Sequence, residues 1–168
     1  LLGIINDILD FSKIETGKLE LVAGDYALSS LINDVYHMLI SKAKEKGLAL
    51  NVESNKNLPA KLYGDEVRIR QIIVNILNNA IKYTKKGSVT LTVGMSDMKL
   101  SDMPDHSNDS KLENITDKNT IITFRIADTG IGIKKENISH LFDSFSRFDE
   151  EKNKYIEGTG LGLAITKQ

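Results

Sequence analysis

Cysteine is absent from the 168 residues of the chain, which excludes disulfides and metal sites built from thiolates. Cysteine usage therefore gives no indication of the redox compartment. The formal net charge is only -1, so no excess of basic residues favours a nucleic-acid partner. No apolar run approaches the roughly 18 residues that a membrane-spanning helix needs, and we expect no membrane segment in this chain.

An initiating methionine is also missing. The chain begins at Leu1 directly in helical periodicity, and it stops at Gln168 soon after a glycine motif has started a new helix. Both ends are therefore expected to be cuts from a longer protein. The length favours one domain with a short attached element, and 40% hydrophobic with 27% charged residues is typical of a globular fold.

The N-terminal segment carries an apolar surface wider than one face of an isolated amphipathic helix. Its apolar side chains are Leu1, Leu2, Ile4, Ile5, Ile8, Leu9, Phe11 and Ile14. Such a helix needs neighbours on two sides, as in a helical bundle. Gly17 and then Gly24-Asp25 interrupt the pattern, which predicts a boundary between a helical element in residues 1–22 and a compact domain in residues 23–168.

The compact domain begins with a predicted core-facing helix, which Ser29 or Ser30 can cap and Gly47 can end. Residues 48–52 then alternate apolar and polar side chains, as a short strand does. The strongest helical pattern in the chain follows, from Asp65 to about Tyr83. These segments predict helices that bury one face each.

Two further strands are predicted at residues 89–93 and 121–127, where β-branched and aromatic side chains are frequent, and we expect the two to pair. Between them, residues 95–119 are rich in Asp, Ser, Asn and Lys and are expected to form a mobile polar loop. No internal repeat and no regular alternation of strand and helix is present. The fold class predicted is α+β, with helices on one face of a mixed sheet.

The helix at 65–83 has two contrasting faces at 100° per residue. One face is apolar and consists of Ile69, Ile72, Ile73, Ile76, Leu77 and Ala80. The other, which we call the polar stripe, consists of Arg68, Gln71, Asn75, Asn79 and Lys82. Asn75, Asn78 and Asn79 each cost up to ~0.7 kcal/mol relative to alanine in a helix. Side-chain amides suit a pocket for phosphates and a divalent cation, although a polar surface with chance asparagines is an equal alternative.

A carboxylate ends the apolar row of the second strand. Ile122, Phe124, Ile126 and Asp128 point to one face by period two, so Asp128 needs a donor such as the exocyclic amine of adenine if it is buried. Gly130 and Gly132 follow it and would let backbone approach a flat ligand closely. The alternative is an ordinary aspartate in a tight turn.

A second glycine cluster, "GTGLGLA" at 158–164, precedes residues of helical character. Free backbone N–H groups there can bind phosphate oxygens, whereas a flexible loop without a ligand is the alternative. The cluster is neither a dinucleotide fingerprint nor a P-loop, because the required strand, spacing and lysine are missing. Before it, three phenylalanines lie in residues 141–148, and Arg147 among them could neutralise a phosphate.

Four motifs in this order resemble the N, G1, F and G2 boxes of sensor histidine kinases, members of the Bergerat-type ATP-binding superfamily. They are "NILNNAIKYT" from Asn75, "DTGIGI" from Asp128, "LFDSFSRFD" from Leu141 and "GTGLGLAI" from Gly158. In addition, "DILDFSKIETGKLEL" resembles the end of that family's second dimerisation helix. The likeness covers nearly the whole chain apart from residues 95–119.

The resemblance implies a two-layer α/β sandwich of the Bergerat type, with ATP between the asparagine helix and a lid at about 133–159. Asp128 would bind the adenine amino group, and Asn79 would hold Mg²⁺. Asn75, Lys82 and Tyr83 would contact phosphates. The full nucleotide-binding set implied is Asn75, Asn79, Lys82, Tyr83, Asp128, Gly130, Gly132, Ile133, Arg147, Gly158, Thr159, Gly160, Leu161 and Gly162.

The function implied is transfer of the ATP γ-phosphoryl group to a histidine on the protein's own dimerisation domain, for relay to an aspartate of a response-regulator receiver domain. The whole protein would be a homodimer acting in the cytoplasm. None of His37, His106 and His140 lies in the family's acceptor box, so the acceptor is expected outside this chain. The alternatives are a nucleotide sensor without kinase activity and a gyrase-like ATPase, and Asn75 in place of a glutamate base argues against the ATPase.

Overall fold

The computed structural model describes residues 2–55, 57–97, 120–144 and 160–167. Most of the predicted 95–119 loop, together with Arg147, Gly158 and Thr159, lies outside these residues. The elements in chain order are α1 (Leu2–Glu15), β1 (Gly24–Ala27), α2 (Leu28–Glu45), β2 (Ala49–Ser54), β3 (Lys61–Gly64), α3 (Glu66–Tyr83), β4 (Ser88–Asp97), β5 (Thr120–Asp128), α4 (Lys135–Ile138) and α5 (Gly162–Lys167).

The main sheet has the strand order β2-β4-β5 and is mixed. β4 and β5 pair antiparallel, with Val89 opposite Asp128, which confirms the predicted pairing of these strands. β2 and β4 are parallel, and a parallel pair needs a crossover connection, which here includes α3. The expectation that strand–helix–strand alternation is absent was therefore wrong for this unit, because the short β3 concealed it.

The core lies between this sheet and two helices. Val89, Leu91 and Val93 alternate along β4 and are all at most 1% exposed, so one face of the sheet is sealed. Apolar side chains of α2 and α3, such as Leu31 and Leu77, belong to the same buried cluster. This arrangement is the predicted two-layer α/β sandwich with a mixed sheet packed on helices.

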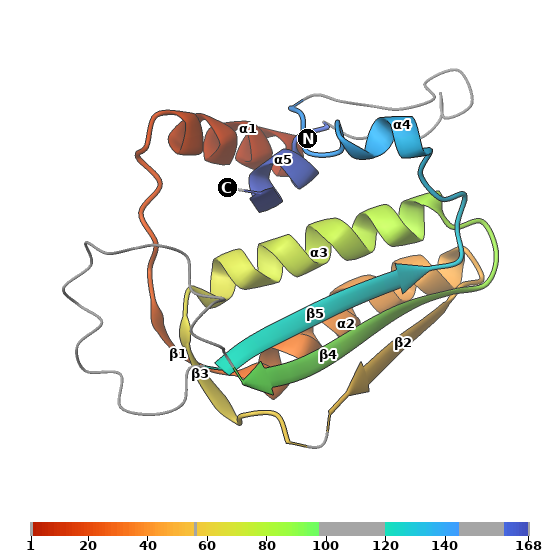
Figure 1. The fold of residues 1–168 in the computed structure, drawn as a ribbon, viewed down its shortest axis with the longest axis horizontal. Helices are drawn as coiled ribbons and strands as arrows, with labels where there is room; N and C mark the ends of the chain where they lie inside the picture. Colours follow the sequence, from red (N-terminus) through yellow and green to blue (C-terminus); the bar gives the residue numbers. More distant parts are fainter. Residues whose placement is uncertain (1, 56, 98–119, 145–159, 168) are drawn as a thin grey trace.

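A second, two-stranded sheet was not predicted. β1 and β3 pair antiparallel from Gly24 opposite Gly64 to Ala27 opposite Lys61. Each strand has four residues, too few for a clear alternation pattern. The two strands are also far apart in the sequence, so their pairing forms only when the chain folds. The pair brings the segment after α1 beside the start of α3 (Figure 1).

Two predicted boundaries needed correction, and one was confirmed. α2 begins at Leu28, directly after β1, and its N-cap is Ala27 without a side-chain cap hydrogen bond, so neither Ser29 nor Ser30 caps it. Gly47 follows the end of α2 at φ 68, as predicted for a helix stop. β4 continues to Asp97, so residues 95–97 are strand rather than loop.

α1 and α5 lie over the side of α3 that faces away from the sheet (Figure 1). Gly17, at φ 64, follows the end of α1 as predicted. Ile5, Ile8 and Leu9 are 46 to 54% exposed, so α1 has only part of its apolar surface covered. Among the helices of the described residues, none combines the length and the apolarity that crossing a membrane requires.

Candidate functional site

α3 is held at both ends by side chains that sequence reasoning did not single out for this purpose. Asp65 is its N-cap, and its Oδ1 accepts from the Arg68 backbone N–H at 3.1 Å. At the other end, the ammonium of Lys46, the C-cap residue of α2, donates to the carbonyls of Ile81 at 2.7 Å, Lys82 at 2.8 Å and Thr84 at 3.2 Å. Three carbonyls that lack helical partners are thereby satisfied.

The apolar face of α3 is buried as expected at Ile73, Leu77 and Ala80, and Ile81 joins it at 0% exposure. Ile72 is an exception at 36% exposure. It lies at the edge of the apolar arc, next to the polar stripe, at 100° per residue. Asn78 also proves to be structural, because its Oδ1 accepts a 2.7 Å hydrogen bond from Lys42 on α2.

All five residues of the polar stripe are half-buried, and three of them contact α1 or α5: Arg68 and Gln71 bond Asp10, and Asn75 bonds Gly162. Asn75 Nδ2 donates weakly to the Gly162 carbonyl at 3.5 Å, so the second glycine cluster reaches the stripe. The Leu161 side chain is fully buried, and any contact of this residue with a ligand would have to use its backbone. Gly160 adopts φ 72, a left-handed conformation that favours glycine.

The first glycine cluster reaches the C-terminal end of the same helix. The Gly130 N–H donates to Asp128 Oδ1 at 2.8 Å, and the Ile131 N–H donates to the Tyr83 carbonyl at 3.3 Å. A Cβ on Gly130 would lie 2.6 Å from the Tyr83 oxygen and 3.0 Å from Thr84 Oγ1. Glycine is therefore required here by close packing of two backbones.

A threonine pins this turn to the sheet. The Thr129 Oγ1 donates to the Lys86 carbonyl at 3.1 Å and accepts from the Ser88 N–H at 3.1 Å. Gly87, at φ 110, leaves room for that hydroxyl, because a Cβ there would lie 2.2 Å from it. The end of α3, the start of β4 and the end of β5 are thus bonded together around Asp128.

Asp128 is exposed, so the condition under which its carboxylate would need a buried donor is not met. Ile122, Phe124 and Ile126 do pack against the core, but the row opens to solvent at the end of the strand. Within the described residues, Asp128 Oδ1 is used by the turn and no partner is found for Oδ2. One carboxylate oxygen therefore remains available to a donor from a ligand.

Lys82 and Tyr83 lie at the end of the polar stripe nearest Asp128. The Lys82 ammonium is 5.0 Å from the centre of the Tyr83 ring, a cation–π distance. The Asn79 side chain has no hydrogen bond to another side chain or backbone group in the described part of the chain. Its amide is half-buried and lies between Asn75 and Lys82 in sequence, so it is available to a ligand.

The remaining predicted residues divide into two groups. Gly132, at φ 68, and Ile133, at 56% exposure, follow the Asp128 turn, and the neighbouring Ile131 is 57% exposed. Ile133 is the first residue of the predicted lid, of which the structure describes residues 133–144. Arg147, Gly158 and Thr159 lie outside the described residues, so their placement stays a prediction.

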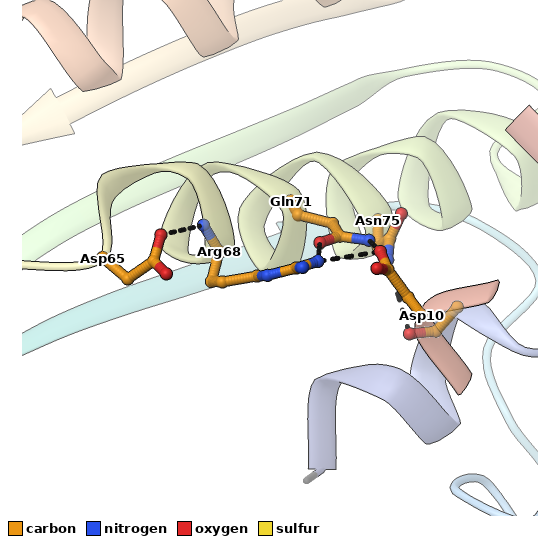
Figure 2. A network of polar contacts seen from close by, with 6 residues as sticks. Asp10, Asp65, Arg68, Gln71 and Asn75 are labelled. Carbon is orange, nitrogen blue, oxygen red and sulfur yellow. Dashed lines mark hydrogen bonds and ion pairs between the residues drawn. The ribbon is translucent and has the colours of Figure 1, made fainter. Parts of the chain in front are cut away.

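Sequence reasoning missed a contact at the other end of the polar stripe (Figure 2). Asp10 of α1 accepts from Arg68 Nη1 at 2.8 Å and from Gln71 Nε2 at 2.9 Å. Arg68 and Gln71 had been assigned to the stripe, but nothing in the sequence indicated that Asp10, which lies 58 residues before Arg68 and 61 before Gln71, is their partner. Asp10 is one of several polar residues on α1, so its presence alone gave no signal.

The donor set for a cation is sparse. Among the described residues, no group of three or more His, Cys, Asp or Glu side chains could hold a metal ion. A single half-buried amide oxygen, that of Asn79, fits Mg²⁺ only if phosphates and waters supply the other ligands, as this ion commonly requires.

A separate hollow of about 840 Å³ lies on α2 and β2. It is lined by side chains such as Leu28, Ile32 and Tyr36, and none of the predicted site residues lines it.

Comparison with known proteins agrees with this geometry. The family model "Histidine kinase-, DNA gyrase B-, and HSP90-like ATPase" matches residues 64–168. The whole chain is 38% identical over 168 residues to hybrid signal transduction histidine kinase B of Dictyostelium discoideum and covers 8% of it. It is 36% identical over 168 residues to signal transduction histidine-protein kinase BarA of Escherichia coli (strain K12) and covers 16% of it.

Among solved structures, full-length ShkA in complex with AMPPNP aligns with a TM-score of 0.72 at 27% identity, over 99% of this chain and 29% of that one. The chain thus spans a minor part of each of these three proteins. The family model covers more than half of the chain, and the two relatives are similar to it along its entire length. The chain therefore belongs to the histidine kinase-, DNA gyrase B- and HSP90-like ATPase family, in which it is an ATP-binding catalytic domain of the sensor histidine kinase type.

Proposed function

We propose that this chain binds Mg²⁺–ATP along the polar stripe of α3 and transfers its γ-phosphoryl group to a histidine of the dimerisation domain of the same protein. The observation that carries the proposal is the convergence of three motifs on one helix. Gly162 contacts Asn75, whereas Gly130 and Ile131 contact the Tyr83 end, eight residues further along. At 1.5 Å per residue this spacing is about 12 Å, roughly the length of a nucleotide.

Asp128 is the residue proposed to recognise the adenine base. Its Oδ1 is fixed by the Gly130 N–H, which orients the carboxylate, while Oδ2 is open to accept from the exocyclic amine of adenine. The tight packing of Gly130 on Tyr83 and Thr84 keeps this carboxylate in one place relative to α3. A fixed acceptor at this position discriminates adenine from guanine. Guanine presents a carbonyl there, which would leave the carboxylate oxygen without a donor.

The phosphate end is assigned to Asn75, Asn79 and Lys82. Lys82 supplies a positive charge, Asn75 supplies amide donors beside Gly162, and the Asn79 oxygen is the proposed ligand of Mg²⁺. The ion would neutralise charge on the phosphoryl group being transferred. Catalysis by this set depends on positioning, because none of the three side chains is a base that can deprotonate water.

An amide at Asn75 also favours transfer over hydrolysis. Neutral imidazole is a sufficient nucleophile by itself, whereas water needs a general base. Two histidines lie in the described residues, and both have other partners. His37 packs edge-on against Tyr36, and His140 bonds Asp143 at 2.7 Å. The proposed acceptor is therefore a histidine of the dimerisation domain, with relay to a receiver aspartate, in a homodimer that uses the cytoplasmic ATP pool.

The proposal is tested by adding a dimerisation domain that carries its own histidine to this chain, together with Mg²⁺ and γ-labelled ATP. Transfer should produce label that is stable in alkali and lost in acid, as a phosphohistidine is. Calorimetry in parallel measures affinity for ATP and GTP. The Asp128→Asn variant should lose selectivity for ATP, because a carboxylate oxygen is replaced by an amide donor that faces the adenine amine.

Three results would count against the assignment. Binding of ATP without labelling of the histidine would support a nucleotide sensor instead. Steady release of phosphate in the absence of the acceptor would support a hydrolase. Unchanged discrimination between ATP and GTP in Asp128→Asn would remove this residue from the base-binding role. Glu53→Gln is a matched control, because Glu53 is an exposed carboxylate on β2 outside the site.

A further inference from the structure

α1 is attached to the polar stripe by a cluster of three side chains, Asp10, Arg68 and Gln71, which we call the clamp. One oxygen of Asp10, Oδ2, accepts from both Arg68 Nη1 and Gln71 Nε2, and Arg68 Nη1 also donates to Gln71 Oε1 at 2.8 Å. Figure 2 shows the three side chains meeting between α1 and α3. The clamp is thus a closed triangle of charge-assisted hydrogen bonds.

The clamp is shielded from water. The side chain of Asp10 is 16% exposed and that of Arg68 is 27% exposed, unlike most surface ion pairs. Partial burial disfavours the charged carboxylate, but hydrogen bonds from Arg68 and Gln71 outweigh it, so the pKa of Asp10 is below its usual value. Removing one member of such a pair leaves the other without its hydrogen bonds in a partly buried place. The loss of stability is therefore larger than for an exposed ion pair.

A second attachment lies just beyond the clamp. The Val22 backbone N–H, in the segment between α1 and β1, donates to Asp65 Oδ2 at 2.9 Å. The other oxygen of Asp65 caps α3 at Arg68, so this carboxylate joins the segment after α1 to the first turn of α3. α1 and the segment that follows it are therefore fixed to the N-terminal half of the helix that carries the proposed phosphate ligands.

α1 also contacts α5, which begins at Gly162 (Figure 1). A helix of six residues is too short to be stable alone, so α5 depends on its neighbours for its position. Those neighbours are α1 on one side and α3 on the other, where Asn75 contacts Gly162. The clamp is one turn from Asn75 along α3, and α1 therefore helps to hold the second glycine cluster against the stripe.

We propose that Asp10, Arg68 and Gln71 are positioning residues that couple nucleotide affinity to the docking of α1. With the clamp closed, α1 holds the start of α5 against Asn75. Gly162 and Asn75, which flank the proposed phosphate site, are then in place before the nucleotide binds. With the clamp open, part of the binding energy must order that segment, which lowers affinity. A signal that rotates or withdraws α1 would then weaken nucleotide binding without touching the nucleotide. This inference rests on the proposed function.

Coupling between sites is reciprocal, so two measurements on the same chain test it. The first is the affinity for ATP with Mg²⁺ by calorimetry, in wild type and in Asp10→Ala. The second is the distance between spin labels on α1 and α2, introduced as Ser12→Cys and Ser41→Cys. Both serines are exposed, and the chain has no other cysteine to label.

Asp10→Ala should weaken ATP binding by about fivefold or more, the low end of typical coupling between sites, and should broaden the label distances. In wild type, saturating ATP should narrow them. The exchange Asp10→Arg with Arg68→Asp should recover much of both properties, because it restores the ion pair in reverse. Asp34→Ala is the matched control: it removes an ion pair from α3 to α2, between Arg70 and Asp34 at 3.2 Å, and should change neither.

The outcomes separate the two proposals. If wild type binds ATP and Asp10→Ala binds it equally well or more tightly, the coupling is wrong while the proposed function stands. If Asp34→Ala weakens binding as much as Asp10→Ala does, the effect is general destabilisation and the coupling is also wrong. If wild type does not bind ATP, the proposed function fails, and the coupling fails with it.

Discussion

At the scale of single residues, the site depends on where backbone comes close to backbone. Gly130 lies against the last residues of α3, and Thr129 fills the space that Gly87 leaves open. These contacts convert an exposed aspartate into a fixed one, since Asp128 bonds the N–H of the same glycine. Gly130 is thus required by close packing, whereas a Cβ on Gly132 would meet no atom within 4 Å.

Gly130→Ala should therefore destabilise the protein by about 1–3 kcal/mol, because the new methyl group would overlap two oxygens and force the Asp128 turn away from α3. Urea unfolding measures this change, and ATP affinity should fall with it. Gly24→Ala is the control, because a Cβ at Gly24 meets no atom within 4 Å. It should alter stability by less than about 0.5 kcal/mol. Equal stability of the two variants would show that the close approach is not rigid.

At the scale of elements, α3 is the platform on which the site is assembled. Both of its ends are held by hydrogen bonds: its N-cap Asp65 bonds Val22 at the start, and Lys46, the C-cap residue of α2, bonds the carbonyls at the end. Most of its apolar face is buried in the core, and its polar stripe bonds Asp10 of α1 and Gly162 of α5. A helix restrained in this way keeps Asn75, Asn79 and Lys82 in one geometry, which is what positional catalysis requires.

Lys46→Met tests the restraint at the C-terminal end. The substitution keeps the aliphatic stem but leaves three carbonyls of residues 81–84 without their shared donor. We expect a loss of about 1 kcal/mol in the free energy of unfolding, the usual net value of such hydrogen bonds near solvent. Faster amide exchange at the last turn of α3 should accompany it. Lys44→Met, an exposed lysine in the same turn of α2, should leave both measurements unchanged.

At the scale of the whole molecule, two carboxylates join the N-terminal segment to the compact domain. The Val22 N–H is the main reason that the pKa of Asp65 lies below its usual value of 3.8, with the Arg68 N–H also contributing against desolvation. For Asp10, desolvation opposes ionisation but the Arg68 and Gln71 hydrogen bonds prevail, and the pKa is again lowered. Both groups therefore favour the folded state in their ionised form.

The sign of the resulting pH dependence follows from these shifts. A carboxyl whose pKa is lower in the folded state contributes stability that is complete above its unfolded pKa, about 4, and is lost as pH falls through the folded value. The free energy of unfolding, measured in urea, should therefore fall from pH 5 towards pH 2.5. The combined Asp10→Asn and Asp65→Asn variant should show a shallower decrease. An identical slope would mean that neither carboxylate contributes to the acid sensitivity.

Much of the fold and of the candidate site was accessible from local pattern. The periodicity of Ile73, Leu77 and Ala80 places one face of α3 in the core, and the alternation at 89–93 identifies β4, because burial of one face imposes these periods. Motif order predicted that Asn75, Asp128 and Gly162 belong to one site, and this assignment stays a prediction. The pairs β1–β3 and Lys46–Ile81 were not accessible, since their partners are about 35 residues apart and each segment is short or unremarkable.

The sequence by itself determined the element types, the burial of each amphipathic face and the identity of the chemical groups available for a nucleotide. Only the tertiary structure decided that Asn78 bonds Lys42, that Asp128 is exposed, and that Asp10 meets Arg68 and Gln71. The physical reason is that hydrophobic periodicity is a property of neighbouring residues, whereas a hydrogen bond between distant side chains depends on how whole elements pack. That packing brings Asp10 of α1 and Gly162 of α5 to the polar stripe.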